Sequence, residues 1–361
     1  RGKVHPGPLP SASNPRPAIA MDFPPPYAPP YAAEAAVAPD KAASRAYLAA
    51  KGFPSGLADL ALGSVRSFGR RYFLVDNSGS MSAPDGHCFE GERMVSCSRW
   101  TEVKDTVIWH AELAVALGAP IQFSFLCQPR SGMQSLRVAS AADVLKLREA
   151  CASGPGGGTP ICMHVRRIAE EIASDAPRLR ASGQQAVLTI ITDGLPTDGD
   201  LAEAMHPLGR LPVWVVVRLC TDEENVLSYW SNLDSVVEVE LEVLDDLAGE
   251  AAEVYQQNSW LTYAPQLHRL REFGIQNKVL DLLDERQLAP SEVRELLALL
   301  LGGGPLPHPE VELLDFLRSV EERQLGLPAV YNPVRRRATP WVDARRLRWA
   351  VEKRWAWCTV S

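Results

Sequence analysis

Oxygen-bearing side chains gather at three places in the sequence where a chain can bend around a small cation. An alternating set follows the apolar run 72–75, a hydroxyl lies in the glycine-rich turn 157–160, and a carboxylate follows the apolar run 186–191. Alternate residues at a strand end point the same way, and glycines let a turn bring its hydroxyl close. Oxygen ligands suit Mg²⁺ or Mn²⁺ and disfavour zinc or copper. The five candidate metal ligands are Asp76, Ser78, Ser80, Thr159 and Asp193.

The three segments together resemble the metal-ion-dependent adhesion site of von Willebrand factor type A (VWA) domains. That site has Asp-x-Ser-x-Ser after a strand, a Thr in a Gly-Gly-Thr-Pro turn and Thr-Asp-Gly after a later strand, and all five ligand positions match here. The resemblance covers residues 70–245. It implies that Asp193 acts through water, so that Asp76 is the one carboxylate that directly neutralises a divalent ion. The ion then keeps positive charge and an open position for a carboxylate of a partner protein.

The function that this resemblance implies is a Mg²⁺-dependent protein-binding module with an intracellular scaffold or assembly role, and no enzymatic activity. One alternative is a metal-dependent hydrolase, in which the same ion activates water. Its general base would come from His87, Glu90 or Glu92. Neither Ser78 nor Ser80 lies in a Gly-x-Ser-x-Gly motif, so the nucleophile elbow of the α/β-hydrolases is absent. A second alternative is a structural adaptor that acts through its proline-rich and helical tails.

A long loop, residues 82–99, separates the Asp-x-Ser-x-Ser motif from the next helix, which begins sooner in most of the VWA family. Its His87, Cys88 and Cys97 raise two alternatives, a zinc site and a Cys88–Cys97 disulfide. Their spacing matches no standard zinc finger. We expect an ordinary polar loop on the rim of the metal site, where it tunes or blocks access.

Apolar strands alternate with amphipathic helices through residues 70–245. This order indicates a doubly wound α/β, Rossmann-like fold with a mostly parallel sheet. Ligands of such sheets bind beyond the carboxyl ends of the strands, where Asp76 and Asp193 fall. Asp198 is expected to hold a turn and Asp200 to cap the next helix. We expect strands at 72–75, 121–126, 136–139, 186–191, 213–217 and 236–243, and helices at 100–117, 141–150, 160–173 and 201–208.

Helical segments flank the predicted α/β domain on both sides. Asp40 is a candidate N-cap for the first of them, and 3.6-residue apolar spacing marks several more after residue 245. The run Gly302-Gly303-Gly304-Pro305 indicates a boundary. The expected organisation is a disordered Pro-rich leader at 1–39, a short helical segment at 40–69, a VWA-like domain at 70–245, a helical extension at 246–304 and a helical, basic and aromatic tail at 305–361.

The proline-rich leader contains a candidate peptide ligand. Pro24-Pro25-Pro26-Tyr27 matches the Pro-Pro-x-Tyr ligand of WW domains, which bind extended proline-rich segments in an aromatic groove. A WW-domain protein is therefore one candidate partner, at Pro24, Pro25 and Tyr27. The alternative is a proline-rich leader without a partner.

The composition is that of an ordinary globular protein, with 46% hydrophobic and 22% charged residues. A net charge of -7 argues against a general nucleic-acid binder, although residues 331–361 carry eight Lys or Arg against two acids. No apolar run approaches the ~18 residues that a membrane span needs. The seven cysteines follow no repeating frame, which is typical of free thiols and predicts a cytoplasmic protein. The sequence begins with Arg1, which fits either a fragment or a translation start at Met21.

Overall fold

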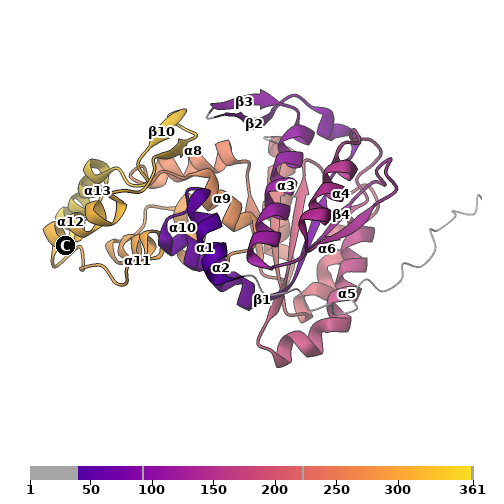
Figure 1. The fold of residues 1–361 in the computed structure, drawn as a ribbon, viewed down its shortest axis with the longest axis horizontal. Helices are drawn as coiled ribbons and strands as arrows, with labels where there is room; N and C mark the ends of the chain where they lie inside the picture. Colours follow the sequence, from indigo (N-terminus) through magenta and orange to yellow (C-terminus); the bar gives the residue numbers. More distant parts are fainter. Residues whose placement is uncertain (1–39, 92, 222, 359–361) are drawn as a thin grey trace, which may run out of the picture. The chain divides into compact units, whose positions relative to one another are not determined.

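The computed structural model describes residues 40–91, 93–221 and 223–358, and these residues belong to one compact unit. A six-stranded sheet with helices on both faces forms its centre (Figure 1). The predicted proline-rich leader, with its WW-ligand motif at Pro24, Pro25 and Tyr27, lies outside the described residues, as does Glu92. Every described helix is too short or too polar to span a bilayer.

The sheet has the strand order β5-β4-β1-β6-β7-β8, and every neighbouring pair is parallel except the pair formed by the edge strand β5. The predicted doubly wound, mostly parallel α/β fold is confirmed. Strand β1 lies inside the sheet, where Tyr72 pairs with Gln122 of β4 and Val75 pairs with Ile191 of β6. The strands span Phe68–Val75 (β1), Ile121–Phe125 (β4), Ser135–Val138 (β5), Gln185–Thr192 (β6), Val213–Leu219 (β7) and Leu241–Leu244 (β8).

Alternate residues of β1 are buried in two different cores. Tyr72 and Leu74 pack with residues of α5, α6 and α7 on one face of the sheet. Phe73 and Val75 pack with residues of α3 and α4 on the other face. A strand that is covered on both sides is apolar at every position, which explains the continuous apolar run in the sequence. The covering helices span Arg99–Leu117 (α3), Ala141–Cys151 (α4), Ile161–Ala181 (α5), Leu201–Met205 (α6) and Glu224–Val236 (α7).

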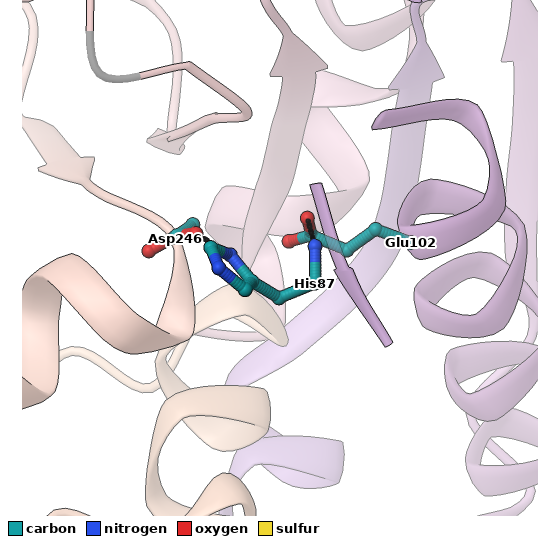
Figure 2. Close-up of side chains that lie close together, drawn as sticks. All are labelled: His87, Glu102 and Asp246. Carbon is teal, nitrogen blue, oxygen red and sulfur yellow. Dashed lines mark hydrogen bonds and ion pairs between the residues drawn. The ribbon is translucent and has the colours of Figure 1, made fainter. Parts of the chain in front are cut away.

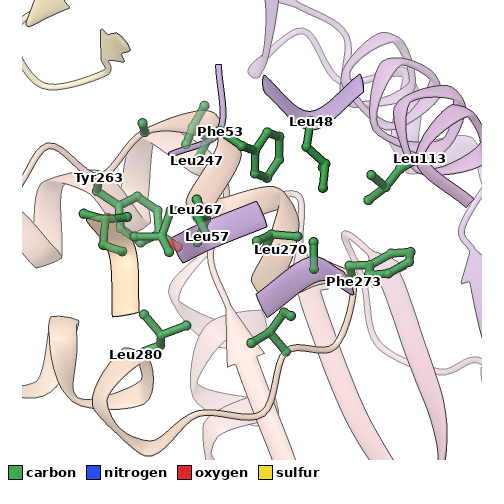
Figure 3. Packing of buried hydrophobic residues seen from close by; sticks show 14 of the residues in the cluster. Leu48, Phe53, Leu57, Leu113, Leu247, Tyr263, Leu267, Leu270, Phe273 and Leu280 are labelled. Atoms are coloured by element: carbon green, nitrogen blue, oxygen red, sulfur yellow. The ribbon is translucent and has the colours of Figure 1, made fainter. Parts of the chain in front are cut away.

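The helices before and after the sheet share one hydrophobic core with its α3 face. Leu48 of α1 belongs to the same buried cluster as Leu270 of α9 and Phe273, which directly follows α9 (Figure 3). Helices α2 and α11 approach so closely that a Cβ on Gly56 would overlap the carbonyl oxygen of Leu299. The helices span Lys41–Ala50 (α1), Ser55–Ser67 (α2), Leu247–Gln257 (α8), Pro265–Glu272 (α9), Lys278–Glu285 (α10), Pro290–Leu301 (α11), Leu313–Gln324 (α12) and Ala344–Cys358 (α13).

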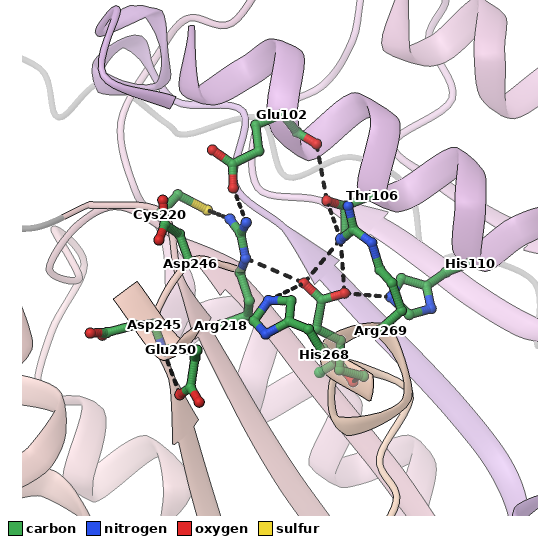
Figure 4. Close-up of polar contacts among 12 residues, drawn as sticks. Glu102, Thr106, His110, Arg218, Cys220, Asp245, Asp246, Glu250, His268 and Arg269 are labelled. Carbon is green, nitrogen blue, oxygen red and sulfur yellow. Dashed lines mark hydrogen bonds and ion pairs between the residues drawn. The ribbon is translucent and has the colours of Figure 1, made fainter. Parts of the chain in front are cut away.

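Buried charges fix α9 against the sheet and α3. The Glu272 carboxylate is fully buried, 2.8 Å from Arg269 Nη1, 2.9 Å from His110 Nε2 and 3.3 Å from Arg218 Nε. Arg218 of β7 also pairs with Glu102 of α3 (Figure 4). Burial alone would raise the pKa of Glu272, but Arg269 and the other neighbours hold it well below its usual value. Because an unpaired buried charge is costly, this network fixes the position of the helical extension.

The segment between β7 and β8 differs from the prediction, which placed a strand at 236–243. Helix α7 continues to Val236, and strand β8 begins only at Leu241. Val226, Trp230 and Leu233 recur with helical spacing and are buried against the sheet. The valines around residue 236 suggested a strand. The helical spacing of the apolar residues before them indicates the helix that the structure shows.

Residues 86–90 and 93–97 pair as two antiparallel strands within the predicted polar loop. The strands of this hairpin are β2 (Gly86–Glu90) and β3 (Arg93–Cys97). A second two-stranded pair, β9 (Val330–Asn332) and β10 (Arg337–Thr339), lies close to it (Figure 1). The rings of Phe89 and Tyr331 meet edge to face with centroids 5.1 Å apart. The hairpin therefore reaches from the loop after β1 to the C-terminal part of the chain.

Candidate metal centre

Three loops at the carboxyl edge of the sheet carry the predicted metal ligands. The loops after β1 and β6 lie side by side, since the Asp76 N–H donates to the Ile191 carbonyl oxygen at 2.8 Å. The glycine turn before α5 is tied to the first loop, since the Gly79 N–H donates to the Gly157 carbonyl oxygen at 3.2 Å. The fold thus brings the three segments together at the edge where such sheets bind ligands.

A continuous series of polar contacts joins four of the five predicted ligands. The Ser78 N–H donates to Asp76 Oδ1 at 2.8 Å, and Ser78 Oγ lies 3.0 Å from Ser80 Oγ. The Ser80 hydroxyl in turn donates to Asp193 Oδ1 at 2.8 Å. Asp76, Ser78 and Asp193 are buried, whereas Ser80 is exposed. The series therefore begins and ends at buried carboxylates and reaches the surface at Ser80.

Thr159, the fifth predicted ligand, is held at the same edge by different contacts. Its N–H donates to Thr197 Oγ1 at 3.1 Å, and its carbonyl oxygen accepts the Thr197 N–H at 3.0 Å. Its hydroxyl oxygen lies 3.9 Å from the position that a Cβ would take on Gly194. The side chain is buried beside the Asp193–Gly194 segment.

Two aspartates secure the helices that begin beside the site. Asp200 caps α6, as predicted, by accepting N–H groups of its first turn. Asp198 was expected to hold a turn. Its carboxylate accepts the N–H groups of Cys162 at 3.1 Å and Met163 at 2.8 Å, so it caps the start of α5. A carboxylate at a helix N-terminus is stabilising. Fixing the start of α5 also fixes Thr159, which lies just before it.

Asp76 is a fully buried carboxylate next to a second acid. Burial raises the pKa of Asp76 above its usual value, hydrogen bonds from Thr192 and Ser78 lower it in part, and the charge of Asp193 raises it. The Thr192 hydroxyl donates to Asp76 Oδ2 at 2.6 Å. The sequence prediction did not give Thr192 a role of its own, although it belongs to the Thr-Asp-Gly motif. A bound cation would favour the ionised form of both acids.

The donor set fits a small, hard divalent cation. Adjacent oxygens of an octahedron with metal–oxygen distances of ~2.1 Å are ~3.0 Å apart. The Ser78 Oγ to Ser80 Oγ distance of 3.0 Å has this spacing. Asp193, which is expected to act through water, accepts a hydrogen bond from Ser80 Oγ at 2.8 Å. Every donor is an oxygen, as Mg²⁺ and Mn²⁺ prefer.

Arg99 is a charged neighbour of the site that the sequence prediction placed only in the rim loop. Its Nη1 donates to Asp193 Oδ2 at 2.9 Å. Its Nε and Nη2 donate to the two oxygens of Asp85 at 2.7 and 2.6 Å, and Nη2 lies 3.3 Å from Glu223 Oε1. The hydrogen bonds that Arg99 donates to Asp85 are the largest reason that the pKa of Arg99 is raised above its usual value. One guanidinium thus joins the candidate site to two surface loops.

His87, Glu102 and Asp246 meet between the hairpin, α3 and the start of α8 (Figure 2). One ligand atom from each lies within 4.8 Å of the others, and His87 Nδ1 lies 3.0 Å from Asp246 Oδ2. Burial alone would raise the pKa of Asp246, but the hydrogen bond from His87 and other contacts lower it to about 2. Glu102 already pairs with Arg218, whose positive charge would repel a metal ion. The cluster therefore serves as an ionic contact that holds the hairpin on the body.

The hairpin geometry does not support the zinc alternative. His87 pairs with Ser96 across the ladder and Gly86 pairs with Cys97. Because successive residues of a strand point to opposite faces, the imidazole of His87 lies on one face of the hairpin and the thiols of Cys88 and Cys97 on the other. Both cysteines are free in the structure.

The residues suggested as a hydrolytic base are engaged elsewhere, exposed at a strand end, or outside the described part of the chain. His87 Nδ1 is engaged with Asp246 on α8. Glu90 lies exposed at the far end of β2, and Glu92 is not among the described residues. The arrangement gives the hydrolase alternative no specific support.

No protein-family model and no curated protein matches this sequence. Among solved structures, the chain is similar to the pilus adhesin SpaC from Lactobacillus rhamnosus GG, with 15% identity and a TM-score of 0.32. That match covers 49% of this chain and only 28% of the adhesin. A conserved hypothetical protein, BatB from Bacteroides thetaiotaomicron, matches with 12% identity and a TM-score of 0.34 over 51% of this chain and 94% of its own. An uncharacterised membrane-spanning protein from Vibrio fischeri has 16% identity and a TM-score of 0.18 over 52% of this chain and 97% of its own.

Proposed function

We propose that residues 70–245 form a VWA-like domain whose carboxyl edge binds Mg²⁺ or Mn²⁺ and captures an acidic side chain of a partner protein. The observation that supports this best is the oxygen series of the site. Asp76, Ser78, Ser80 and Asp193 are linked by contacts of 2.8 to 3.0 Å although they come from two segments more than a hundred residues apart. Thr159, from a third segment, lies beside Gly194, the residue after Asp193.

Both buried and exposed residues of the site would hold the cation. Asp76, Ser78, Ser80 and Thr159 would hold the ion, and Asp193 would act through water, as the sequence resemblance implies. The bound ion would supply a positively charged position for a carboxylate. Ser80 is exposed, so the place where the carboxylate binds would face the solvent next to Ser80.

Exposed apolar side chains beside the site suit a protein partner. Met163, in the first turn of α5, is 51% exposed, and Leu195, which follows Asp193–Gly194, is 38% exposed. Both lie on the segments that carry the proposed ligands. An acidic residue with an apolar neighbour therefore suits this surface better than an isolated charge does.

Calorimetric titration of the full chain with MgCl₂ and MnCl₂ tests metal binding. We expect uptake by the wild type, reversal by EDTA, and loss of uptake in Asp76→Ala and Asp76→Asn. The matched control is Asp59→Asn on α2, whose side chain is 53% exposed. Circular dichroism checks that each variant is folded. A folded wild type that takes up neither ion would overturn the proposal.

Capture of a carboxylate is tested separately, with acetate as the probe. Water-proton relaxation of the Mn²⁺-loaded chain reports water bound to the ion. If the ion accepts a foreign carboxylate, acetate will lower this relaxation in a saturable way, whereas acetamide at the same concentration will not. Metal uptake without an acetate effect would leave a metal site but contradict acidic-residue capture.

A further inference from the structure

Arg99 places a buried positive charge directly against one of the proposed metal ligands. Its side chain is 5% exposed, and Nη1 lies 2.9 Å from Asp193 Oδ2. The other oxygen of the same carboxylate, Oδ1, accepts the hydrogen bond of Ser80. Asp193 thus shares its two oxygens between the guanidinium and the oxygen series of the candidate metal site.

The position of Arg99 is unfavourable for the helix that carries it. Arg99 is the first residue of α3, after the N-cap Ser98, whose hydroxyl accepts the Thr101 N–H. The N-terminus of a helix carries partial positive charge and favours anions. Burying a guanidinium there adds a desolvation cost. Helix formation alone therefore does not explain this arginine, whereas its contact with Asp193 does.

The contact changes the net formal charge of the site. Asp76 and Asp193 contribute two negative charges, and Arg99 contributes one positive charge, so the buried groups sum to -1. A bound divalent ion would bring this sum to +1, compared with zero if Arg99 were neutral. Asp85 and Glu223 also contact Arg99, and since their side chains are 50% and 56% exposed, water reduces their opposing effect without cancelling it.

We propose that Arg99 is a specificity-determining residue of the metal site, which weakens the hold on the cation and strengthens the attraction for an anionic ligand. The inference rests on the proposed metal-dependent function. Its distinctive consequence is that loss of the arginine charge raises the affinity for the cation and lowers the affinity for the anionic ligand. A merely structural role for Arg99 predicts that both affinities fall together when the loop is disturbed.

Variants of Arg99 and its outer partner separate these outcomes. In Arg99→Gln, we expect Mn²⁺ to bind at least about fivefold more tightly and acetate to bind the Mn²⁺-loaded chain at least about fivefold more weakly. Arg99→Lys keeps the charge and should restore both values toward the wild type. Asp85→Asn removes a negative charge while keeping Arg99, so both shifts should reverse in sign. The matched control is Arg148→Gln, whose side chain is 51% exposed on α4.

Calorimetry with MnCl₂ and water-proton relaxation with acetate give the two affinities, and thermal unfolding shows whether each variant is folded. If Arg99→Gln leaves both affinities unchanged or weakens both, the inference is wrong while the metal site stands. If Arg99→Gln does not fold, Asp85→Asn decides, because its side chain is exposed and its loss should not unfold the chain. A folded wild type without Mn²⁺ uptake overturns the metal site itself, and this inference with it.

Discussion

Arg271 Nη1 lies 2.6 Å from Glu250 Oε2 in the interior, where both side chains are only 2% exposed. The same guanidinium donates from Nε to Glu242 Oε1 at 2.8 Å. One cation therefore faces two buried carboxylates. Burial raises the pKa of Glu250 to about 8 and that of Glu242 to about 7, in spite of the attraction from Arg271. The folded chain holds protons here that an unfolded chain releases.

The stability of the protein should fall as the pH rises through neutrality. A glutamate whose pKa is raised by folding contributes stability that is complete below its unfolded pKa of ~4.3 and is lost as the pH rises through the folded pKa. With folded values of about 7 and about 8, the loss accumulates as the pH rises from ~4.3 and is complete once the pH has passed the folded values. Urea unfolding at about pH 6 and about pH 9 measures it. The variant Glu250→Gln, which cannot ionise, should lose less stability over this interval.

Other groups around Arg271 titrate too, so a control is needed. Glu295→Gln changes an exposed glutamate on α11 and should follow the wild-type pH dependence. Comparison of the variants separates the contribution of Glu250 to the pH dependence of stability from that of its charged and titratable neighbours. These neighbours are Glu242, Asp245, Tyr263, Arg271, Asp281 and Asp284. Identical curves for the wild type and Glu250→Gln would contradict the prediction.

The charge of Glu272 should be essential for stability. The variant Glu272→Gln leaves the buried Arg218 and the partly buried Arg269 without their shared carboxylate. Breaking a buried ion pair from one side costs about 3–5 kcal/mol. Urea denaturation at neutral pH measures the change in the free energy of unfolding. Glu322→Gln, on the exposed side of α12, should stay within about 0.5 kcal/mol of the wild type. A cost below about 1 kcal/mol for Glu272→Gln would show that this network does not hold α9 in place.

The sheet could be predicted from the sequence because its signals are local. The apolar run from Tyr72 to Val75 and its counterpart in β6 are continuous, as strands covered on both faces must be. The segment before β8 was misassigned because Val236 and its neighbours are β-branched, a composition that favours strands when read without tertiary context. The hairpin after β1 depends on contacts with distant residues, such as Phe89 with Tyr331, which local patterns do not reveal.

The candidate site also has one part that the sequence reveals and another that it does not. The proposed ligands lie in short motifs, so their order along the chain was visible in the sequence. The contact between Arg99 and Asp193 joins residues 94 positions apart, and that between His87 and Asp246 joins residues 159 apart. Neither pair has a fixed spacing that a single sequence could disclose. The unusual arginine after a serine cap was the one local signal for the first pair.

Thr159 provides a test of the full donor set. Thr159→Val keeps the shape of the side chain but removes the hydroxyl, so Mn²⁺ affinity should fall about tenfold or more, as expected for the loss of a polar contact to a charged group. Thr159→Ser keeps the hydroxyl and should retain most of the affinity. Thr197→Val removes a neighbouring hydroxyl that accepts the Thr159 N–H, so any fall in its Mn²⁺ affinity measures the positioning of Thr159 alone and should be smaller than that of Thr159→Val. Equal affinities in Thr159→Val and the wild type would remove Thr159 from the set of ligands.

The turn after α9 should tolerate no side chain on its glycine. Gly274 has φ +91°, and a Cβ there would lie 2.5 Å from Val187 Cγ2 in the middle of the sheet. Gly274→Ala therefore combines backbone strain with overpacking and should cost about 3 kcal/mol. Gly326 is the matched control, since it has φ +89° and open space around its Cβ position. Gly326→Ala should cost only the strain, about 1 kcal/mol. Urea unfolding of both variants measures the difference, which is the contribution of the close contact between α9 and β6. Equal costs in the two variants would mean that the C-terminal helices do not pack on the sheet as closely as the structure shows.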